Sequence, residues 1–267
     1  MSAASSDQLN LKGPFYSGFL AKKRDGNPAY TAEDQGCIER TVAQLRVQST
    51  DANKPGILLG KIQSGKTKAF LAIIALAFDN QYDIAIILTK PTTTLAKQTC
   101  KRVSKEFADF VEGDQVKVHD ILELPERLTQ FELRQKLIFV VKKQTDNLDR
   151  LFTALLTTYP QLAQKRILIV DDEADNASIG YFQDKTSGLQ LRTIAAQVDE
   201  LRRSLPNASF LQVTATPYSL YLQPEDSPLA DTALAPVRPR FTELLPVHPA
   251  YVGGKFYFED SSVQTDP

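Results

Sequence analysis

The sequence predicts an α/β fold with a doubly wound, mostly parallel sheet and helices on both faces. Three observations lead to this prediction. Short, almost wholly apolar runs recur along the chain, as buried parallel strands do. Longer segments with apolar residues at helical spacing separate these runs. The third observation is the segment GKIQSGKT at residues 60–67. It matches the phosphate-binding pattern G-x-x-x-x-G-K-[ST], which lies between a buried strand and a helix.

The bulk composition is that of an ordinary globular chain. The 267 residues are 42% hydrophobic and 24% charged, and the formal net charge is −1. A chain of this length can bury a substantial core. The near-neutral charge gives no global basic field that would indicate a nucleic-acid partner, so any such surface has to be local.

The cysteine and histidine content and the lack of targeting signals limit the kinds of site and the cellular location that we expect. The two cysteines, Cys37 and Cys100, are too few for a disulfide framework or a zinc site, and the two histidines, His119 and His248, lie far apart. The N-terminal residues MSAASSDQLNLKG lack the basic and apolar regions of a signal peptide, and no apolar run approaches the length of a membrane span. We therefore expect a cytoplasmic protein with no membrane partner.

The chain begins with a polar segment, residues 1–30, which we interpret as an N-terminal arm. Its aromatic side chains, Phe15, Tyr16 and Phe19, are expected to pack it onto the domain. A helix from about residue 32 to residue 48 follows, with Thr31 as its N-cap.

Strands and helices then alternate. Strands are expected at residues 55–59, 84–88, 116–121, 137–141, 167–170 and 210–213, and helices at residues 66–79, 92–110, 147–159 (ended by Pro160) and 189–205. Strands separated by helices imply a parallel, doubly wound sheet, in which ligands bind at the carboxyl ends of the strands. The phosphate-binding segment and the residues that follow the last two strands all fall at that edge.

The GKIQSGKT segment provides the groups that a polyphosphate needs. Gly60 and Gly65 have no Cβ, so backbone N–H groups can come close to the phosphate oxygens. Lys66 adds a cation for the β- and γ-phosphates, and the Thr67 hydroxyl can ligate magnesium. The helix that follows presents the positive end of its dipole to the same anion.

An acidic run follows the strand at residues 167–170. It contains Asp171, Asp172, Glu173 and Asp175. In a phosphoryl-transfer site, one aspartate holds the magnesium shell and an adjacent glutamate polarises the attacking water. The alternative interpretation is a surface acidic turn that caps the next helix.

Beyond Thr216 regular periodicity disappears. Eight of the 15 prolines lie from Pro217 onward. We interpret residues 218–267 as a Pro-rich, loop-rich extension with a short hairpin through Gly253 and Gly254.

Several segments together resemble the motifs of one helicase superfamily. Residues 172–175 read DEAD, residues 91–98 read PTTTLAKQ and residues 214–217 read TATP, in the order found in superfamily-two helicases and related ATPases. This resemblance covers about residues 30–217 and implies a RecA-like P-loop ATPase domain over residues 31–217. The segments GKIQSGKT, DDEADNASIG, QVTATP and YVGGKFYF together look most like the Z-one ATPases, which are encoded beside putative endonucleases in bacterial defence and restriction loci.

The resemblance implies ATP and Mg²⁺ as cofactors and assigns roles to particular residues. The catalytic residues would be Glu173, Lys66 and Asp172. The nucleotide would be bound by Gly60, Lys61, Gln63, Ser64, Gly65, Lys66, Thr67 and Gln35. The metal would be held by Thr67, Asp172 and Asp171. Coupling between the ATP site and the last strand would involve Asp175, Thr214 and Thr216. The nucleic-acid backbone would contact Thr92, Thr93, Thr94, Lys142 and Lys143.

Three of these assignments have open alternatives. Asp171 and Asp172 both stay metal candidates, because a shift of register by one residue exchanges their positions. Gln35 either reads adenine or is an ordinary glutamine on an exposed helix. Lys142 and Lys143 either contact nucleic acid or belong to a solvated face.

One part of the superfamily pattern has no counterpart in this sequence. Such motors have two RecA-like domains, and the second supplies arginines that reach the γ-phosphate, which can contribute a factor of about 10³–10⁵ in turnover. We expect a second RecA-like domain to be absent from this chain, so that a further domain or a partner chain completes the ATP site. Alone, the chain should bind nucleotide and hydrolyse it slowly.

Three functions compete at this point. The leading hypothesis is the motor domain of a nucleic-acid-dependent ATPase, acting on DNA rather than RNA in defence or restriction. The second is a nucleotide-gated module that recruits a nuclease or another partner with negligible turnover. The third, a small-molecule P-loop kinase, is disfavoured by the paired DEAD and TAT elements.

Overall fold

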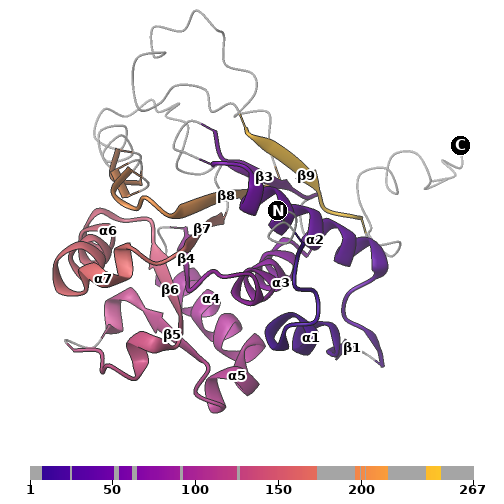
Figure 1. Ribbon diagram of the computed structural model, residues 1–267, viewed down its shortest axis with the longest axis horizontal. Coiled ribbons are helices and arrows are strands. Elements are labelled where there is room, and N and C mark those ends of the chain that lie inside the picture. The colour runs from indigo at the N-terminus through magenta and orange to yellow at the C-terminus, as the bar shows by residue number, and fades with distance from the viewer. Residues whose placement is uncertain are drawn as a thin grey trace, which may run out of the picture.

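A computed structural model describes most of the chain up to residue 172 and shorter stretches beyond it. The described residues are 8–24, 26–50, 54–61, 65–90, 93–124, 127–172, 196–198, 200–201, 203–215 and 239–247. Seven strands form one sheet in which all neighbours are parallel (Figure 1). The expected α/β fold with a parallel sheet is confirmed.

The order of the strands brings the motifs of the sequence to one edge. The sheet runs β5–β6–β4–β7–β8–β3–β9. The strands span Val116–Asp120 (β5), Lys136–Lys142 (β6), Ile84–Thr89 (β4), Ile167–Asp172 (β7), Ala208–Thr214 (β8), Gly56–Leu59 (β3) and Phe241–Leu244 (β9). Because all seven strands are parallel, the phosphate-binding loop after β3, the acidic end of β7 and Thr214 at the end of β8 share one edge.

Helix α3 (Lys66–Asp79) runs through the interior. Every residue from Ala69 to Phe78 is buried, and the helix packs against strand residues such as Ile87 and Val170. A helix that is apolar all round is stable only when it is covered all round. Helices α1 (Pro14–Leu20) and α2 (Ala32–Val47) pack against α3 and contribute to this cover, and α2 also contacts the strands β3, β8 and β9 (Figure 1).

The N-terminal arm contains α1, for which the sequence gives no periodic signal. The rings of Phe15, Tyr16 and Phe19 are buried, as expected, and Phe15 and Phe19 contact aromatic rings of α3 and its neighbours. The Asp79 carboxylate, at the end of α3, accepts the backbone N–H groups of Phe15 at 3.3 Å and Tyr16 at 2.7 Å. This carboxylate, from outside the helix, therefore accepts hydrogen bonds from two N–H groups in the first turn of α1, which have no partner within the helix.

The opposite face of the sheet is covered by α6 (Thr145–Phe152), the π-helix η3 (Thr153–Thr158) and α7 (Pro160–Ala163) (Figure 1). Helices thus lie on both faces. The expected single helix over residues 147–159 is instead two helical segments, and Pro160 begins α7 rather than ending its predecessor. Proline is tolerated at a first helical position because its missing N–H would have had no partner there.

Other elements differ from expectation in their bounds. The helix expected over residues 92–110 is divided into α4 (Thr93–Glu106) and α5 (Ala108–Glu112), with the buried ring of Phe107 between them. The described residues between positions 196 and 204 are helical, within the helix expected over 189–205. Short elements complete the described chain: β1 (Lys23–Arg24), β2 (Asn27–Pro28), η1 (Ile121–Glu123) and η2 (Glu132–Arg134).

Strand β9 lies in a segment that the sequence predicts to be loop-rich. It pairs with β3 in parallel register, from Gly56 opposite Phe241 to Leu59 opposite Leu244. Only Phe241 of its four residues is buried, so the strand has too short an apolar pattern to be detected from sequence. The hairpin expected at Gly253 and Gly254 lies outside the described residues.

Among the described residues, no helix is long and apolar enough to cross a membrane.

Candidate functional site

The phosphate-binding loop joins β3 to α3. Gly65, the residue before α3, has φ 82° and ψ 22°, in the left-handed region that favours glycine. A Cβ at Gly65 would meet no atom of the described residues within 4 Å, and the left-handed backbone conformation accounts for the glycine. Lys66 lies at the start of α3, and its ammonium group donates to the Lys61 carbonyl at 3.1 Å. The expected ligands Gln63 and Ser64 lie outside the described residues.

The loop is tied to the neighbouring strand through the main chain. Gly60, the first residue of the loop, donates its N–H to the Thr214 carbonyl at 3.1 Å. Thr214 is fully buried at the end of β8 and pairs with Leu59. The expected coupling residue Thr214 therefore adjoins the phosphate-binding loop. Its expected companions Asp175 and Thr216 lie outside the described residues.

Asp171 and Asp172 point to opposite faces of the sheet. The strand β7 extends two residues further than expected and includes both aspartates. Side chains alternate along a strand, so Asp172 shares a face with Leu168 and Val170, which pack on the α3 side. Asp171 faces the side covered by α6 and α7.

Asp172 and Thr67 line the same cavity, which has a volume of about 140 Å³. The other lining residues are Thr89, Lys90, Gln98, Thr99 and Arg102. A hydroxyl and one carboxylate, together with phosphate oxygens and water, form the oxygen-rich set that Mg²⁺ takes beside a nucleotide. The residues present thus fit Mg²⁺. Elsewhere in the described part of the chain, no three His, Cys, Asp or Glu side chains form a metal-binding group.

Burial raises the pKa of the Asp172 carboxyl to about 6, against the opposing influence of the nearby Lys143 ammonium; the Asp171 charge raises the pKa further, and Lys66 and Lys90 lower it. A carboxylate held in a poorly solvated cleft is ready to accept a cation, because the cation replaces the stabilisation that water would have given. The expected base Glu173 lies outside the described residues.

Asp171 is occupied by an internal ion pair. Its Oδ1 lies 2.7 Å from the Lys143 ammonium, and the two side chains are 4% and 1% exposed. Lys143 was expected to contact nucleic acid, but its ammonium group is buried under the strand ends and is turned toward Asp171. Strand alternation accounts for both placements: Lys143 directly follows β6, whose odd-numbered residues face the α6 side.

Three other residues expected at the nucleic-acid surface lie at the same edge. Lys142 ends β6 and is half-buried. Thr93 and Thr94 are the first two residues of α4, and Thr92 lies outside the described residues.

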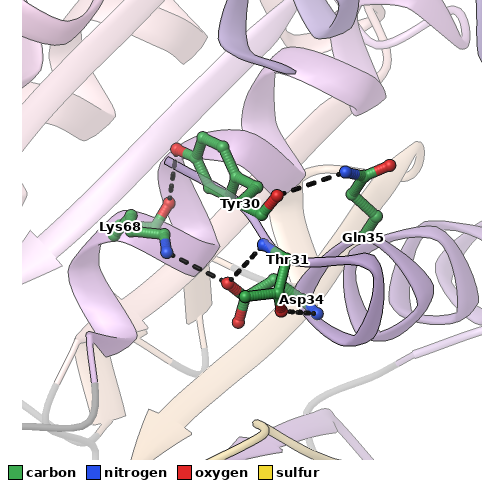
Figure 2. A network of polar contacts seen from close by, with 5 residues as sticks. All are labelled: Tyr30, Thr31, Asp34, Gln35 and Lys68. Carbon is green, nitrogen blue, oxygen red and sulfur yellow. Dashed lines mark hydrogen bonds and ion pairs between the residues drawn. The ribbon is translucent and has the colours of Figure 1, made fainter. Parts of the chain in front are cut away.

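Gln35 lies in the first turn of α2, within a polar network that reaches α3 (Figure 2). Its Nε2 donates to the Tyr30 carbonyl at 3.3 Å. Thr31 and Asp34 form a capping box, each side chain accepting the other residue's backbone N–H at 3.1 Å. The Asp34 carboxylate also binds the Lys68 ammonium at 3.0 Å, two residues beyond Lys66. The half-buried Gln35 is therefore held near the phosphate-binding helix.

Tyr30 and Lys68 strengthen this connection. The Tyr30 hydroxyl donates to the Lys68 carbonyl at 3.3 Å, and the Lys68 ammonium lies 4.7 Å from the centre of the Tyr30 ring (Figure 2). A cation over an aromatic face is attracted by the ring quadrupole. Two helices that are distant in sequence are thus joined next to the phosphate-binding loop.

Comparison with known proteins identifies the family to which this chain belongs. A sequence profile described as "DEAD/DEAH box helicase" matches residues 44–221, more than half of the chain. The chain belongs to the DEAD/DEAH box helicase family. No curated protein sequence matches it.

Solved structures of similar fold are also helicases. The DUF1998 helicase MrfA bound to DNA and AMPPNP is 14% identical, with a TM-score of 0.52 over 86% of this chain and 29% of that chain. MrfA bound to DNA alone gives a TM-score of 0.53 at the same identity and coverage. A DEAD-box helicase bound to ssRNA and UDP-BeF is 19% identical, with a TM-score of 0.45 over 78% of this chain and 40% of that chain. The present chain therefore spans less than a third of the length of MrfA.

Sequence reasoning missed several residues of the site. Lys90, Gln98 and Arg102 line the cavity beside Thr67, although the sequence assigned none of them to the ATP site. Lys68 carries no motif signal at all. Asp34 could have been found, because Thr31 and Asp34 are spaced as in a capping box.

Proposed function

We propose that this chain is the nucleotide-binding domain of a nucleic-acid-dependent ATPase that hydrolyses ATP with Mg²⁺. One observation carries the proposal: Thr67, from the phosphate-binding helix, and Asp172, from the acidic strand, line a single cavity at the carboxyl edge of the sheet. Membership of the helicase family and the AMPPNP bound in a structure of similar fold support ATP as the nucleotide.

In this proposal the phosphates lie against the loop of residues 60–67. Gly65 lets the backbone turn into α3, Lys66 neutralises phosphate charge, and the helix N-terminus adds its dipole. Thr67 and Asp172 would hold Mg²⁺, which would supply positive charge to neutralise the γ-phosphate. Glu173, the next residue after Asp172, orients the attacking water and accepts its proton.

Asp172, rather than Asp171, is the magnesium carboxylate in this proposal. The two residues are adjacent in sequence, but only Asp172 lies on the face that contains α3 and Thr67. Asp171 already binds Lys143 at 2.7 Å. We assign adenine recognition to Gln35, whose side chain is linked through Tyr30 to Lys68 of the phosphate-binding helix (Figure 2).

Nucleic acid is the proposed partner at the edge formed by Lys142, Thr93 and Thr94. The helicases of similar fold are bound to DNA in one case and to ssRNA in another. We favour DNA and a role in defence or restriction beside a nuclease, on the resemblance of GKIQSGKT, DDEADNASIG and QVTATP to Z-one ATPases. We also propose that this segment alone turns over slowly, since the superfamily takes arginines for the γ-phosphate from a second domain.

Nucleotide binding tests the proposal directly. A fluorescent ATP analogue is titrated into wild type, Lys66→Ala and Lys117→Ala, with Mg²⁺ and with EDTA. Wild type and Lys117→Ala should bind with Mg²⁺, and Lys66→Ala should lose at least tenfold in affinity. Lys117 is a suitable control because it lies on β5, at the far end of the sheet. Equal binding by wild type and Lys66→Ala would reject the proposed site.

Phosphate release then separates the remaining functions. The longest natural form of the protein is assayed with single- and double-stranded DNA and RNA. Stimulated release of free phosphate supports the ATPase. Nucleotide-dependent capture of a nuclease with negligible release supports the recruitment module, and transfer of phosphate to a small molecule supports the kinase.

A further inference from the structure

The strand β7 separates two adjacent carboxylates onto two faces of the sheet. Asp172 faces the cavity that contains Thr67, and Asp171 faces the side covered by α6 and α7. The peptide that joins the two residues must therefore be held in an extended conformation with a fixed direction. A rotation of this peptide would turn the Asp172 carboxylate away from Thr67.

Lys143 is placed to hold the chain on either side of that peptide. Its ammonium group contacts Asp171 Oδ1 at 2.7 Å and the Asp172 carbonyl oxygen at 3.3 Å. Lys143 is itself fixed, because its backbone N–H donates to the Thr89 carbonyl at 2.9 Å, which joins the ends of β6 and β4. One lysine thus connects the carboxyl ends of β6, β4 and β7.

Stability alone is a weak reason for this ion pair. The Lys143 and Asp171 side chains are 1% and 4% exposed, so both charges have lost their water. For a buried pair the desolvation cost largely offsets the attraction, and well-packed apolar residues of similar volume often serve as well or better. A group that orients a metal ligand contributes to metal affinity rather than to stability, because its loss weakens metal binding even when the fold remains.

We propose that Lys143 and Asp171 are positioning residues for the magnesium–nucleotide site. Lys143 draws the Asp171 carboxylate and the Asp172 carbonyl toward the α6 side, and the alternation of the strand then directs the Asp172 carboxylate toward Thr67. Neither residue touches the nucleotide or the metal. This inference rests on the proposed function, in which Thr67 and Asp172 hold Mg²⁺.

The test uses a double variant that removes both charges together. In Lys143→Met/Asp171→Leu, two uncharged side chains replace the pair, with Leu branched at Cγ as Asp is, so that no single buried charge is left without its partner. Thermal unfolding reports the fold. The affinity for a fluorescent, non-hydrolysable ATP analogue is measured with Mg²⁺ and with EDTA, and the ratio of the two gives the gain in affinity due to Mg²⁺.

We expect the double variant to unfold within a few degrees of wild type and to keep the affinity measured in EDTA. The gain in affinity due to Mg²⁺ should fall by about tenfold or more, the size of effect seen when groups that orient metal ligands are removed. Lys143→Arg, which keeps a cation at the same position, should retain more of the gain than the double variant. A double variant with the full wild-type gain would overturn the inference.

A second ion pair in the same sheet provides the matched control. Lys136 and Asp83 join the amino ends of β6 and β4, with Nζ 2.9 Å from Oδ1. Lys136→Met/Asp83→Asn should leave the gain due to Mg²⁺ unchanged. An equal loss in this control would show a general effect of removing an ion pair between strands, and would also overturn the inference.

Two outcomes keep this inference distinct from the proposed function. If wild type shows no gain from Mg²⁺, or Lys66→Ala binds as tightly as wild type, the proposed function fails and the inference with it. If wild type behaves as proposed and the double variant matches it, the inference alone fails. Should Lys143→Met/Asp171→Leu not fold, Lys143→Met/Asp171→Asn replaces it and is judged by the same ratio, because Asn keeps the shape of the Asp171 side chain.

Discussion

The ring of Phe241 lies directly over the main chain of Gly56: a Cβ at Gly56 would come within 2.4 Å of the ring Cζ. These residues are partners in the pairing of β3 with β9. The pairing of β9 with β3, the strand that leads into the phosphate-binding loop, therefore depends on a glycine at the first position of β3. Phe241 is the buried residue of β9, so its ring anchors that strand.

Gly56→Ala should destabilise the protein, because the new methyl group occupies space filled by the Phe241 ring. Overpacking of this kind typically costs about 1–3 kcal/mol. Urea denaturation measures the loss. Phe241→Leu in the Gly56→Ala background should recover part of the stability, and the two substitutions should be strongly non-additive. Additive effects would show that the ring and the glycine do not contact each other in solution.

Asp172→Asn should make the protein more stable at neutral pH. Burial raises the Asp172 pKa to about 6 in the folded state, so the ionised carboxylate costs stability. Because the folded pKa is higher than the unfolded pKa, the protonated Asp172 stabilises the fold below the unfolded pKa. This stabilisation is lost as the pH rises through the folded pKa of about 6. Asparagine does not ionise, and the gain at pH 7.5 should be on the order of 2 kcal/mol.

The same Asp172→Asn substitution should abolish the Mg²⁺-dependent part of nucleotide binding. Thermal unfolding without nucleotide measures the first effect, and nucleotide titration with and without Mg²⁺ measures the second. A variant that is both less stable at pH 7.5 and unchanged in its response to Mg²⁺ would contradict both expectations.

Asp34→Ala should weaken the junction between α2 and α3. The substitution removes a capping-box acceptor and the partner of Lys68. Loss of a capping side chain costs about 0.5–2 kcal/mol. Asp34→Asn keeps the acceptor for the Thr31 N–H but loses the negative charge, so it should cost less than Asp34→Ala in urea denaturation. Equal losses would assign the whole effect to the ion pair with Lys68.

His119 should make the protein sensitive to mild acid. Burial lowers the pKa of the His119 imidazole; Glu132 opposes this shift and Lys117 adds to it. The side chain is 7% exposed, and its Nε2 has no partner among the described residues. The unfolded chain takes up the proton first, so stability falls as pH drops below the unfolded pKa, near 6.5.

His119→Gln tests this expectation, since glutamine does not titrate. The free energy of unfolding of wild type is compared with that of His119→Gln between pH 5 and pH 8. Wild type should lose stability relative to the variant as the pH falls through this range. A constant difference across the range would show that His119 does not carry the acid sensitivity.

The sheet could be predicted from sequence because its signals are local. Each central strand is a short apolar run, and the loop at residues 60–67 has a fixed spacing. Four of the six expected strands fall short of the observed ones by one to three residues, and at β7 this matters. The missing residues there are Asp171 and Asp172, whose faces are defined only once both belong to the strand. In the proposed function, this separation of the two faces is the reason why Asp172, rather than Asp171, is assigned to the metal.

Features that depend on distant partners could not be predicted. Lys143 looks like a surface lysine until β7 places Asp171 beside it. Strand β9 buries one residue and forms because β3 offers it an edge. Helix α1 is seven residues long, and an acceptor for its first turn comes from Asp79, at the end of another helix. In each case the deciding interaction joins segments more than 20 residues apart.

The hydrogen bond from the Gly60 N–H to the Thr214 carbonyl joins the phosphate-binding loop to the end of β8 through backbone atoms alone. Substituting Thr214 or Gly60 with any other amino acid except proline leaves both atoms of that bond in place. Alanine substitutions at the coupling residues Thr214 and Thr216 would therefore test their hydroxyl groups and leave this backbone hydrogen bond in place. Replacing the Gly60 amide with an ester removes this donor; it also weakens the Leu59 carbonyl, which accepts the Leu245 N–H at 2.8 Å. This replacement is the change that should loosen the phosphate-binding loop from β8.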